Sequence, residues 1–449
     1  MPERYDVVIA GAGVAGATAA YFLARRGLKV LLVDVKPFER AGDKPCGDAM
    51  AKHHFETVGI REPSGEELEG VVKAIDIISP SEEVRYRVAG DGYEVNRVVF
   101  TQRLISDARD AGAEYLEKTQ VRKAVIKDGV LRGAILWSRE RGEWEVSADV
   151  LIDATGMSRA ILRSLPDDWP IKDPIDPKDL NIAYREIRKL RAEVEEPEVL
   201  RIYLSPSKAP GGYWWFFPYS LKKGVVNVGL GVQGGMGHPL PRNLLYEKIL
   251  IRPEFSGSAI IESGGAAVPT RRPLDTLVWN GIAAIGDAAY TVNPVHGGGK
   301  GTAMISAKCV AEAIAAGGSV DNASLWGANR CYMEAYGAKQ ASLDFLRMFL
   351  QKMSEEDLEW VMKKRVVDAD DINIMATSGD LEEKIVARAL RLMMAAIRRP
   401  AFMSRLKALS DYMKEIKNHY LRYPETPEGL REWALKRDKI YEDFKAKVL

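Results

Sequence analysis

The sequence is poor in the residues that form disulfide frameworks and metal centres. It has 3 cysteines and 5 histidines in 449 residues, which is too few for a disulfide-stabilised scaffold. No spacing of His and Cys resembles a zinc site, so we expect no metal. Long hydrophobic runs are also lacking. No stretch of about 18 or more apolar residues occurs, and we therefore expect no membrane-spanning helix.

The chain also has no large excess of positive or negative side chains. Lys and Arg total 64 against 63 Asp and Glu, so the overall balance gives no electrostatic reason to bind nucleic acid. We therefore expect no nucleic-acid partner. Residues 1–4 lead directly into a strand pattern without an apolar signal segment, which predicts a cytoplasmic location.

One segment departs from this charge balance. Residues 381–449 hold 16 Lys and Arg against 10 Asp and Glu, and residues 385–409 mix these cations with Leu, Met and Phe. A basic amphipathic helix of this kind usually covers the core of a domain and keeps its charges in water, which is the interpretation we favour. The alternative is a peripheral contact with an anionic membrane.

What the chain does have is the length and the apolar content for several structural units. With 449 residues, of which 46% are hydrophobic, it exceeds what a single core organises. The patterns predict an α/β protein with a discontinuous Rossmann-type dinucleotide-binding domain, an antiparallel β-sheet substrate domain and a C-terminal helical region. We place the boundaries at 1–173, 174–273, 274–320 and 321–449, with 71–95 as a candidate part of the substrate sheet.

The first unit begins with a complete βαβ pattern. Residues 5–10 form a short apolar run that suits a buried parallel strand. A small-residue helix pattern follows over 17–26, and a second strand pattern over 28–33 ends at Asp34. Both strands therefore end at the same edge of the predicted sheet.

The turn between that first strand and the helix carries a GxGxxG motif. Gly11 permits the tight turn, Gly13 lets the backbone approach a pyrophosphate, and Gly16 lets the helix pack closely on the strand. Asp34, about 20 residues further on, is placed to accept hydrogen bonds from a ribose. A Gly-rich turn without a ligand is the alternative. Because a helix N-terminus offers free N–H groups to an anion, the motif predicts a bound dinucleotide.

Later motifs choose between NAD and FAD. The sequence IGD at 285–287 ends a strand pattern, and the glycine-rich stretch 293–301 opens a helix. Here the chain resembles the flavoprotein group that includes the aromatic hydroxylases, and DATG at 153–156 resembles a third motif of that group. The resemblance implies FAD as cofactor, with Asp287 on its ribitol chain and the helix near Gly299 pointing its positive end at the flavin.

Two further stretches narrow the resemblance to one family. KPCGD at 44–48 and PGGYWWFFP at 210–218, which fits PxxYxWxFP, are similar to motifs of the geranylgeranyl reductases. The similarity is greatest to the archaeal enzymes that saturate isoprenoid chains of membrane lipids, and it covers residues 1–320. The resemblance implies FAD contacts at Gly11, Gly13, Ala15, Gly16, Asp34, Lys44, Cys46, Gly47, Asp48, Arg103, Val121, Asp287, Gly298, Gly299 and Lys300.

The same resemblance implies a function for the aromatic residues 213–217. Tyr213, Trp215 and Phe217 alternate, so on a strand they share one face, while Trp214 and Phe216 share the other. A prenyl chain has no polar group along its length, and an aromatic-walled tunnel would hold it. A sandwich core without a ligand is the alternative. We expect the first three aromatic residues to bind substrate.

The reaction implied by the resemblance is hydrogenation of carbon–carbon double bonds in geranylgeranyl chains of archaeal-type lipids or their precursors. Reduced FAD would supply a hydride to one alkene carbon, and a proton would reach the other. Cys46 and His296 are the candidate proton donors. For His296 the alternative is a residue that caps a turn, and for His53 and His54 we expect surface or capping positions.

Other functions are left open. A flavin-dependent monooxygenase or halogenase is the main alternative, because halogenases carry a similar Trp-x-Trp-x-Ile-Pro motif, from which this chain departs at Tyr213 and Phe217. A prenyl-lipid carrier that keeps FAD only for structure is a further alternative. The sequence shows no second GxGxxG unit for a nicotinamide, so the electron donor is either a ferredoxin or a diffusible hydride donor.

Two cysteines fall near the expected cofactor. The resemblance of KPCGD to the family motif implies that Cys46 lies beside the flavin, and Cys309 lies on the helix that would start under it. We favour two unrelated buried thiols. A disulfide between them, of the kind found in hyperthermophile proteins, is the alternative.

Overall fold

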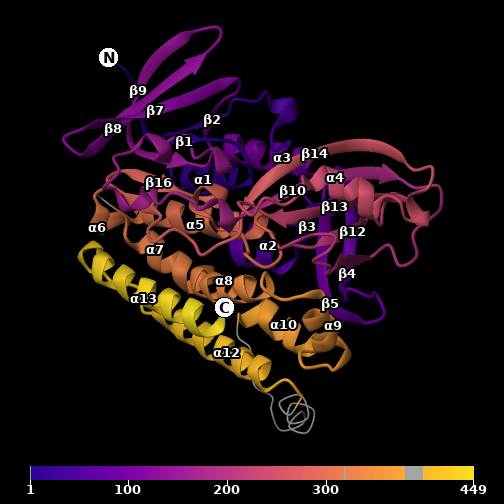
Figure 1. Ribbon diagram of the computed structural model, residues 1–449. Coiled ribbons are helices and arrows are strands. Elements are labelled where there is room, and N and C mark those ends of the chain that lie inside the picture. Colours follow the sequence, from indigo (N-terminus) through magenta and orange to yellow (C-terminus); the bar gives the residue numbers. More distant parts are fainter. Residues whose placement is uncertain (1, 318–319, 380–397) are drawn as a thin grey trace.

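Two eight-stranded sheets organise the chain (Figure 1). The computed structural model describes residues 2–317, 320–379 and 398–449. The first sheet has the order β15-β16-β9-β1-β2-β6, and the hairpin of β7 and β8 extends it from β9. Its strands are β1 (Glu3–Ala10), β2 (Val30–Val33), β6 (Glu114–Leu116), β7 (Thr119–Lys127), β8 (Val130–Ser138), β9 (Gly142–Asp153), β15 (Val278–Trp279) and β16 (Ile282–Ala284).

The middle of this first sheet is parallel and buried. β1 lies between β2 and β9 and runs parallel to both, and β16 is parallel to β9. Val7, Val8 and Ile9 have no exposed surface, as expected for an apolar run covered on both faces. The helices α1 (Val14–Ala24) and α5 (Lys300–Ala316) pack on each other. Two segments far apart in sequence therefore complete one Rossmann-type unit.

The second sheet has the order β14-β10-β13-β12-β11-β4-β5-β3. Residues 180–269 supply five of its strands, and residues 49–95 supply the other three. Its strands are β3 (Ala49–Ala51), β4 (Leu68–Ile78), β5 (Arg85–Val95), β10 (Leu180–Lys189), β11 (Val199–Tyr203), β12 (Trp214–Pro218), β13 (Val225–Gln233) and β14 (Ala259–Pro269).

One pair of strands in the second sheet departs from the expected antiparallel pattern. The pairs among β10 to β14 are antiparallel, but β11 lies parallel to β4. More than a hundred residues of the first unit separate these two strands, so no hairpin dictates their direction. The sheet is thus a joint product of both units, and the loop that contains KPCGD leads directly into its edge strand β3.

Helices cover one side of both sheets, with the C-terminal pair outermost (Figure 1). α12 packs on α8 and on α13. Residues 385–397 of the basic stretch lie outside the described residues. In its described remainder, Phe402 and Leu409 are buried. The other helices are α2 (His53–Val58), α3 (Arg97–Asp110), α4 (Pro241–Leu244), α6 (Asn322–Leu325), α7 (Gly327–Tyr332), α8 (Ala338–Leu350), α9 (Glu355–Lys363), α10 (Ala369–Ser378), α12 (Pro400–Leu421) and α13 (Leu430–Val448).

The cysteines are arranged differently from either expectation. Cys309 on α5 is bonded to Cys331 on α7, and Cys46 is free. The interpretation of Cys309 as an unbonded thiol is therefore wrong, and so is the alternative bridge to Cys46. α5 packs directly on α7, which brings together two residues that share no motif in the sequence.

None of the helices in the described residues is both long enough and apolar enough to cross a bilayer. The same part of the chain contains no group of three or more His, Cys, Asp or Glu side chains arranged to hold a metal ion.

Candidate functional site

The three glycines of the glycine-rich turn have two different functions, close packing and space for a ligand. A Cβ added at Gly11 would lie 2.5 Å from the carbonyl oxygen of Ala154, and one at Gly16 would overlap the carbonyl oxygen of Gly11. At Gly13, the residue that caps α1, an added Cβ would meet no atom within 4 Å. Gly11 and Gly16 thus serve the contact between strand and helix, while Gly13 borders open space. That space fits a pyrophosphate at the helix N-terminus.

Asp34 faces this turn from the end of β2. Its carboxylate accepts hydrogen bonds from the backbone N–H of Ala12 at 2.7 Å and of Lys36 at 2.8 Å. Both carboxylate oxygens keep a second lone pair for a ribose. The backbone of Thr119 donates to the Asp34 carbonyl, so β7, which carries the buried Val121, begins at the same edge of the sheet.

A salt bridge joins the two halves of the dinucleotide unit. Lys44 Nζ lies 2.6 Å from Asp287 Oδ2, although 243 residues separate them. Burial favours the neutral acid, but the charges of Lys44 and Arg97 outweigh it and hold the pKa of Asp287 below its ordinary value. Gly299 lies beside Asp287, since a Cβ added there would be 3.4 Å from Asp287 Oδ1. Asp287 is therefore an ionised acceptor. It borders, with Gly13, Asp34 and Gly299, the space that we call the cofactor cradle.

The KPCGD loop is held by a buried hydrogen-bond network. The Nδ2 group of Asn227 donates to the carbonyl of Cys46 at 2.8 Å and to Asp48 Oδ2 at 3.1 Å. Tyr219 donates its hydroxyl proton to the same carboxylate oxygen, and Trp215 Nε1 donates to Asn227 Oδ1 at 3.0 Å. The loop is thus tied to β12 and β13 of the second sheet.

Lys300, the first residue of α5, reaches into the same loop. Its side chain is buried, and Nζ donates to the Asp48 carbonyl at 2.7 Å and lies 3.9 Å from Cys46 Sγ. Burial raises the pKa of the Cys46 thiol, but the charges of Lys300 and Arg97 overcome this effect and lower the pKa below its ordinary value. Cys46 is accordingly a stronger acid than an ordinary thiol.

The aromatic strand presents two different faces, as predicted from its alternation. Trp214 and Phe216 pack in one core of the second sheet, while Trp215 and Phe217 pack with Tyr213 on the opposite face. A Cβ added at Gly47 would lie 3.2 Å from the ring of Phe217. The KPCGD loop therefore crosses this second face, which Val72, Ala49, Ile75, Ala183, Leu200 and Ile202 extend as an apolar surface.

Comparison with known proteins matches both halves of this arrangement. Residues 6–161 match the family described as FAD dependent oxidoreductase, and residues 179–268 match the geranylgeranyl reductase catalytic domain. Digeranylgeranylglycerophospholipid reductase of Sulfolobus acidocaldarius is 44% identical over 98% of each chain. The chain belongs to the geranylgeranyl reductase family. The match to the geranylgeranyl reductase catalytic domain favours a reductase over a monooxygenase or halogenase.

More distant proteins share the fold of this reductase. The reductase of Methanosarcina acetivorans is 31% identical, over 85% of this chain and 90% of its own. A geranylgeranyl bacteriochlorophyll reductase-like protein of Thermoplasma acidophilum superimposes with a TM-score of 0.76 at 22% identity, over 86% of this chain and 98% of its own. The flavin-dependent brominase Bmp2 gives 0.64 at 20% identity, over 88% and 99%. These two structures confirm the predicted α/β flavoprotein fold.

Arg103 lies apart from the cradle of the reductase. On α3 it donates to Asp107 at 2.8 Å and approaches Glu67 at 3.5 Å. The arginine that faces the site is Arg97, which donates to the Gly42 carbonyl at 2.9 Å and lowers the pKa of both Cys46 and Asp287. The two arginines are six positions apart, and this spacing places them about 120° apart around a helix.

His296 lies in the turn before α5. Its Nδ1 accepts the backbone N–H of Gly298 at 3.1 Å, and its carbonyl accepts the Tyr213 hydroxyl proton at 2.6 Å. Part of the side chain is exposed, but the surrounding protein and the charge of Lys339 lower its pKa to about 4. His296 is therefore neutral near pH 7. It fits the turn-capping alternative, and its role as a proton donor stays a prediction.

His54 does not lie at the surface, contrary to expectation. A Cβ added at Gly301 would overlap its ring, and its Nδ1 is buried without a hydrogen-bond partner among the described residues. Burial and the nearby charges of His53 and His296 lower the pKa of His54 to about 3. His53 itself is exposed. The imidazole of His54 thus packs as a neutral group beside the start of α5.

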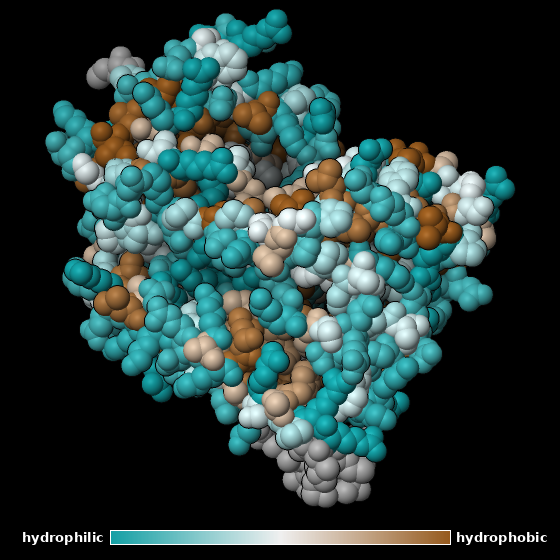
Figure 2. Space-filling view, viewed as in Figure 1, coloured by the Kyte–Doolittle hydropathy of each residue, from teal (hydrophilic) through white to brown (hydrophobic). Residues whose placement is uncertain are grey.

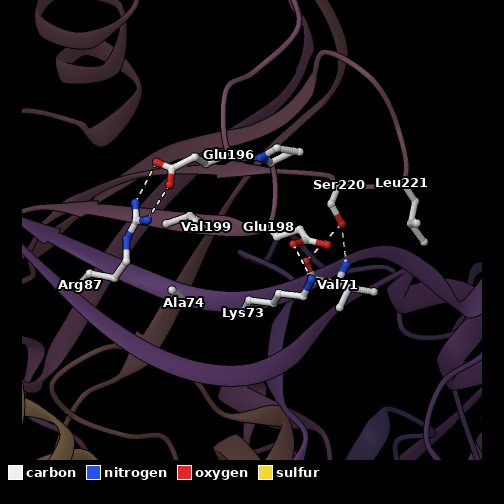
Figure 3. Close-up of a pocket in the computed structure, with 10 residues that line it drawn as sticks. Val71, Lys73, Ala74, Arg87, Glu196, Glu198, Val199, Ser220 and Leu221 are labelled. Carbon is white, nitrogen blue, oxygen red and sulfur yellow. Dashed lines mark hydrogen bonds and ion pairs between the residues drawn. The ribbon is translucent and has the colours of Figure 1, made fainter.

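A separate pocket lies on the second sheet, away from the flavin motifs (Figure 3). It has a volume of about 410 Å³, and its charges pair with one another, Lys73 with Glu198 at 2.8 Å and Arg87 with Glu196 at 2.5 Å. Because these charges are satisfied, the pocket offers no unpaired group to a ligand. It is lined by Val71, Lys73, Ala74, Arg87, Glu196, Pro197, Glu198, Val199, Ser220 and Leu221.

Proposed function

We propose that this reductase binds FAD and hydrogenates the geranylgeranyl double bonds of archaeal-type digeranylgeranylglycerophospholipids. The observation that carries the proposal is the contact between the KPCGD loop and the aromatic face of β12. Asn227 bonds both Cys46 and Trp215, so an apolar wall lies directly under the loop that borders the cofactor cradle. An apolar chain laid on that wall has its double bonds beside the Cys46 thiol.

The residues around the cradle suit the parts of FAD in order. Gly13 leaves room for the pyrophosphate, and Asp34 offers lone pairs to the ribose. Asp287, ionised beside Lys44, suits the ribitol hydroxyls. Lys300 and the N-terminus of α5 provide positive charge for the flavin ring. When bound, reduced FAD supplies the hydride.

The protein supplies orientation, protection and the proton. Trp215 and Phe217 hold the chain in a water-poor site, and their ring faces can stabilise positive charge that develops on an alkene carbon. The Cys46 thiol, made more acidic by Lys300, gives its proton to the second carbon. The thiolate left behind is held by Lys300 at 3.9 Å.

The substrate places the enzyme at a membrane surface during uptake. Hydrophobic side chains are exposed around α4 and the start of β14, at the right-hand end of the view in Figure 2. They are Met236, Leu240, Tyr246, Ile251, Ile260 and Ile261. Co-flotation of the protein with liposomes, reduced in Ile251→Asp, tests this peripheral contact.

The decisive experiment incubates FAD-loaded, dithionite-reduced protein with digeranylgeranylglycerophospholipid without oxygen. Products that grow heavier in two-dalton steps support the proposal. In a parallel incubation of the reduced protein with oxygen, stoichiometric peroxide release, or a halogenated product in the presence of halide, would instead favour the monooxygenase or halogenase. Replacing dithionite by a reduced ferredoxin or by NADPH then distinguishes the two classes of electron donor.

A further inference from the structure

Glu94 on β5 is a buried acid without a partner. Its exposed fraction is 0%, and within the described part of the chain neither carboxyl oxygen has a hydrogen-bond partner. Glu186 is equally buried, but it pairs with Arg188 and accepts a hydrogen bond from Tyr246. An unpaired ionised carboxylate in such a place is strongly unfavourable. Among the described residues, no ion pair accounts for the burial of Glu94.

The position of Glu94 is directly behind the KPCGD loop. In the register of β3 with β5 it lies opposite Ala49, the residue that follows Asp48. Its carboxyl group reaches Gly70 on β4, since a Cβ added there would be 2.8 Å from Glu94 Oε2. Asp48 in turn lies 4.0 Å from Lys300 Nζ, which lies 3.9 Å from Cys46 Sγ. The charges of Asp48 and Lys300 thus act on both Glu94 and Cys46.

Burial and the neighbouring charges favour the protonated form of Glu94. Burial and the carboxylates of Asp48 and Glu69 raise its pKa well above the ordinary value, and the opposing charge of Lys300 does not overcome them. Tyr219 also faces this cluster. Because Lys300 lowers the pKa of Cys46, the acidities of the carboxylic acid and the thiol approach each other. Proton transfer between groups of similar acidity needs little driving force.

We propose that Glu94 is the proton store that recharges Cys46 between successive double-bond reductions, an inference that rests on the proposed function. In each cycle the S–H bond of Cys46 breaks and a C–H bond forms on the alkene carbon, while reduced flavin is the source of the hydride for the other carbon. The thiolate then takes a proton from Lys300, and the O–H bond of Glu94 breaks to restore the ammonium group. Glu94 then regains its proton from solvent.

Glu94→Gln tests the store, because glutamine keeps the shape but has no acidic proton. Infrared spectroscopy of the resting protein should show the C=O band of a buried protonated carboxylic acid in the wild type and lose it in the variant. With lipid, the variant should complete a first two-dalton step at the normal rate and then continue about 10-fold or more slowly. Glu69→Gln, a carboxyl of the same cluster that Lys222 already pairs, is the matched control and should behave as wild type.

Each outcome has a distinct meaning. If wild-type protein yields no two-dalton products, the proposed function fails, whereas wild-type steps with unchanged multiple turnover in Glu94→Gln overturn only the proton store. Absence of the carboxylic-acid band in wild type also overturns it, as does equal slowing in Glu69→Gln. Should the glutamine variant not fold, a pH titration of wild type decides, because loss of the band and loss of later turnovers must then coincide.

Discussion

Asp287 is the ionised hydrogen-bond acceptor that we expect to bind the ribitol chain of FAD. We expect Asp287→Ala to weaken FAD binding by about 1–3 kcal/mol, because ribitol hydroxyls in a partly buried site would lose a charged acceptor. Titration of apoprotein with FAD, followed by fluorescence, measures this change. Asp149→Ala, which removes a salt-bridged aspartate from β9 of the same sheet, should leave the affinity unchanged. Equal affinities in the two variants would contradict the assignment of Asp287.

The lowered pKa values of His54 and His296 predict that the folded protein loses stability at acidic pH. Their folded-state pKa values, about 3 and about 4, lie below the ordinary 6.5, so the folded protein binds fewer protons than the unfolded chain. Stability from these groups is present above pH 6.5 and is lost as pH falls toward 4. Melting temperatures of His54→Asn should depend less on pH over this window than those of wild type. His53→Asn, which changes an exposed ring, should retain most of the wild-type dependence.

Motif residues could be predicted singly from the sequence, but their partners could not. Asp34, Lys44 and Asp287 occur in recognisable contexts, whereas the ion pair between the last two depends on a strand order that no local pattern encodes. Helix periodicity separates Arg97 from Arg103 on α3, but it does not tell which of them faces the cofactor. Asn227 had a usable signal, because it is a polar residue in the apolar run 225–231 and a buried amide needs partners.

Two glycines at the start of α1 should respond differently to substitution by alanine. We expect Gly13→Ala to fold but to lose FAD, since its methyl group meets no protein atom and instead fills the space next to the helix N-terminus. Gly16→Ala should unfold at lower temperature even without FAD, because its methyl group would overlap the Gly11 carbonyl. Thermal unfolding of both apoproteins, with FAD titration of the folded one, checks the pair. A Gly13→Ala variant that binds FAD normally would exclude this turn as the pyrophosphate site.

Strand β12 makes a similar test possible through its two faces. We expect Trp215→Ala to slow saturation of long prenyl chains about 10-fold or more while dithionite still reduces its flavin, because the wall is lost and the cofactor contacts remain. Trp214→Ala should mainly destabilise the protein, by about 3–5 kcal/mol for a fully buried tryptophan. Rapid-mixing measurements of flavin reduction beside lipid product analysis resolve the two effects. Equal loss of both rates in Trp215→Ala would argue against the tunnel.

Strand positions followed from alternation and apolar runs, but strand neighbours did not. The pattern at 213–217 correctly predicted which aromatic residues share a face, because the period of two is local. The parallel pairing of β4 with β11 depends on how the first unit folds between them. Long-range pairing of this kind has no local signal in a single sequence.

The disulfide between α5 and α7 ties the cofactor domain to the C-terminal helices. Its cysteines are 22 residues apart, and we expect Cys331→Ser to lower stability by about 2–4 kcal/mol through the unfolded chain. Chemical denaturation of wild type and variant under non-reducing conditions measures the difference. Thiol titration of denatured, unreduced wild type should find one reactive thiol, and a count of three would contradict the bridge.

Charge networks across the whole molecule were beyond the sequence. Asp275 pairs with Arg272 at 2.8 Å and with Arg437 on α13, and Tyr423 donates to its carbonyl. These contacts dock the last helix on the cofactor domain. A balance of 64 cations and 63 anions indicates that many pairs can form, but only the packed arrangement of helices decides which ones do.

With Cys309 and Cys331 bonded to each other, the remaining thiol of the chain is Cys46, in the KPCGD loop. Its lowered pKa favours the thiolate, which is the nucleophilic form. An alkylating reagent with a prenyl tail would therefore attach at one known position without prior removal of other cysteines. A fluorescent or spin label placed there can report when a lipid chain arrives, and protection of that thiol by substrate can count occupied sites in a preparation before any turnover.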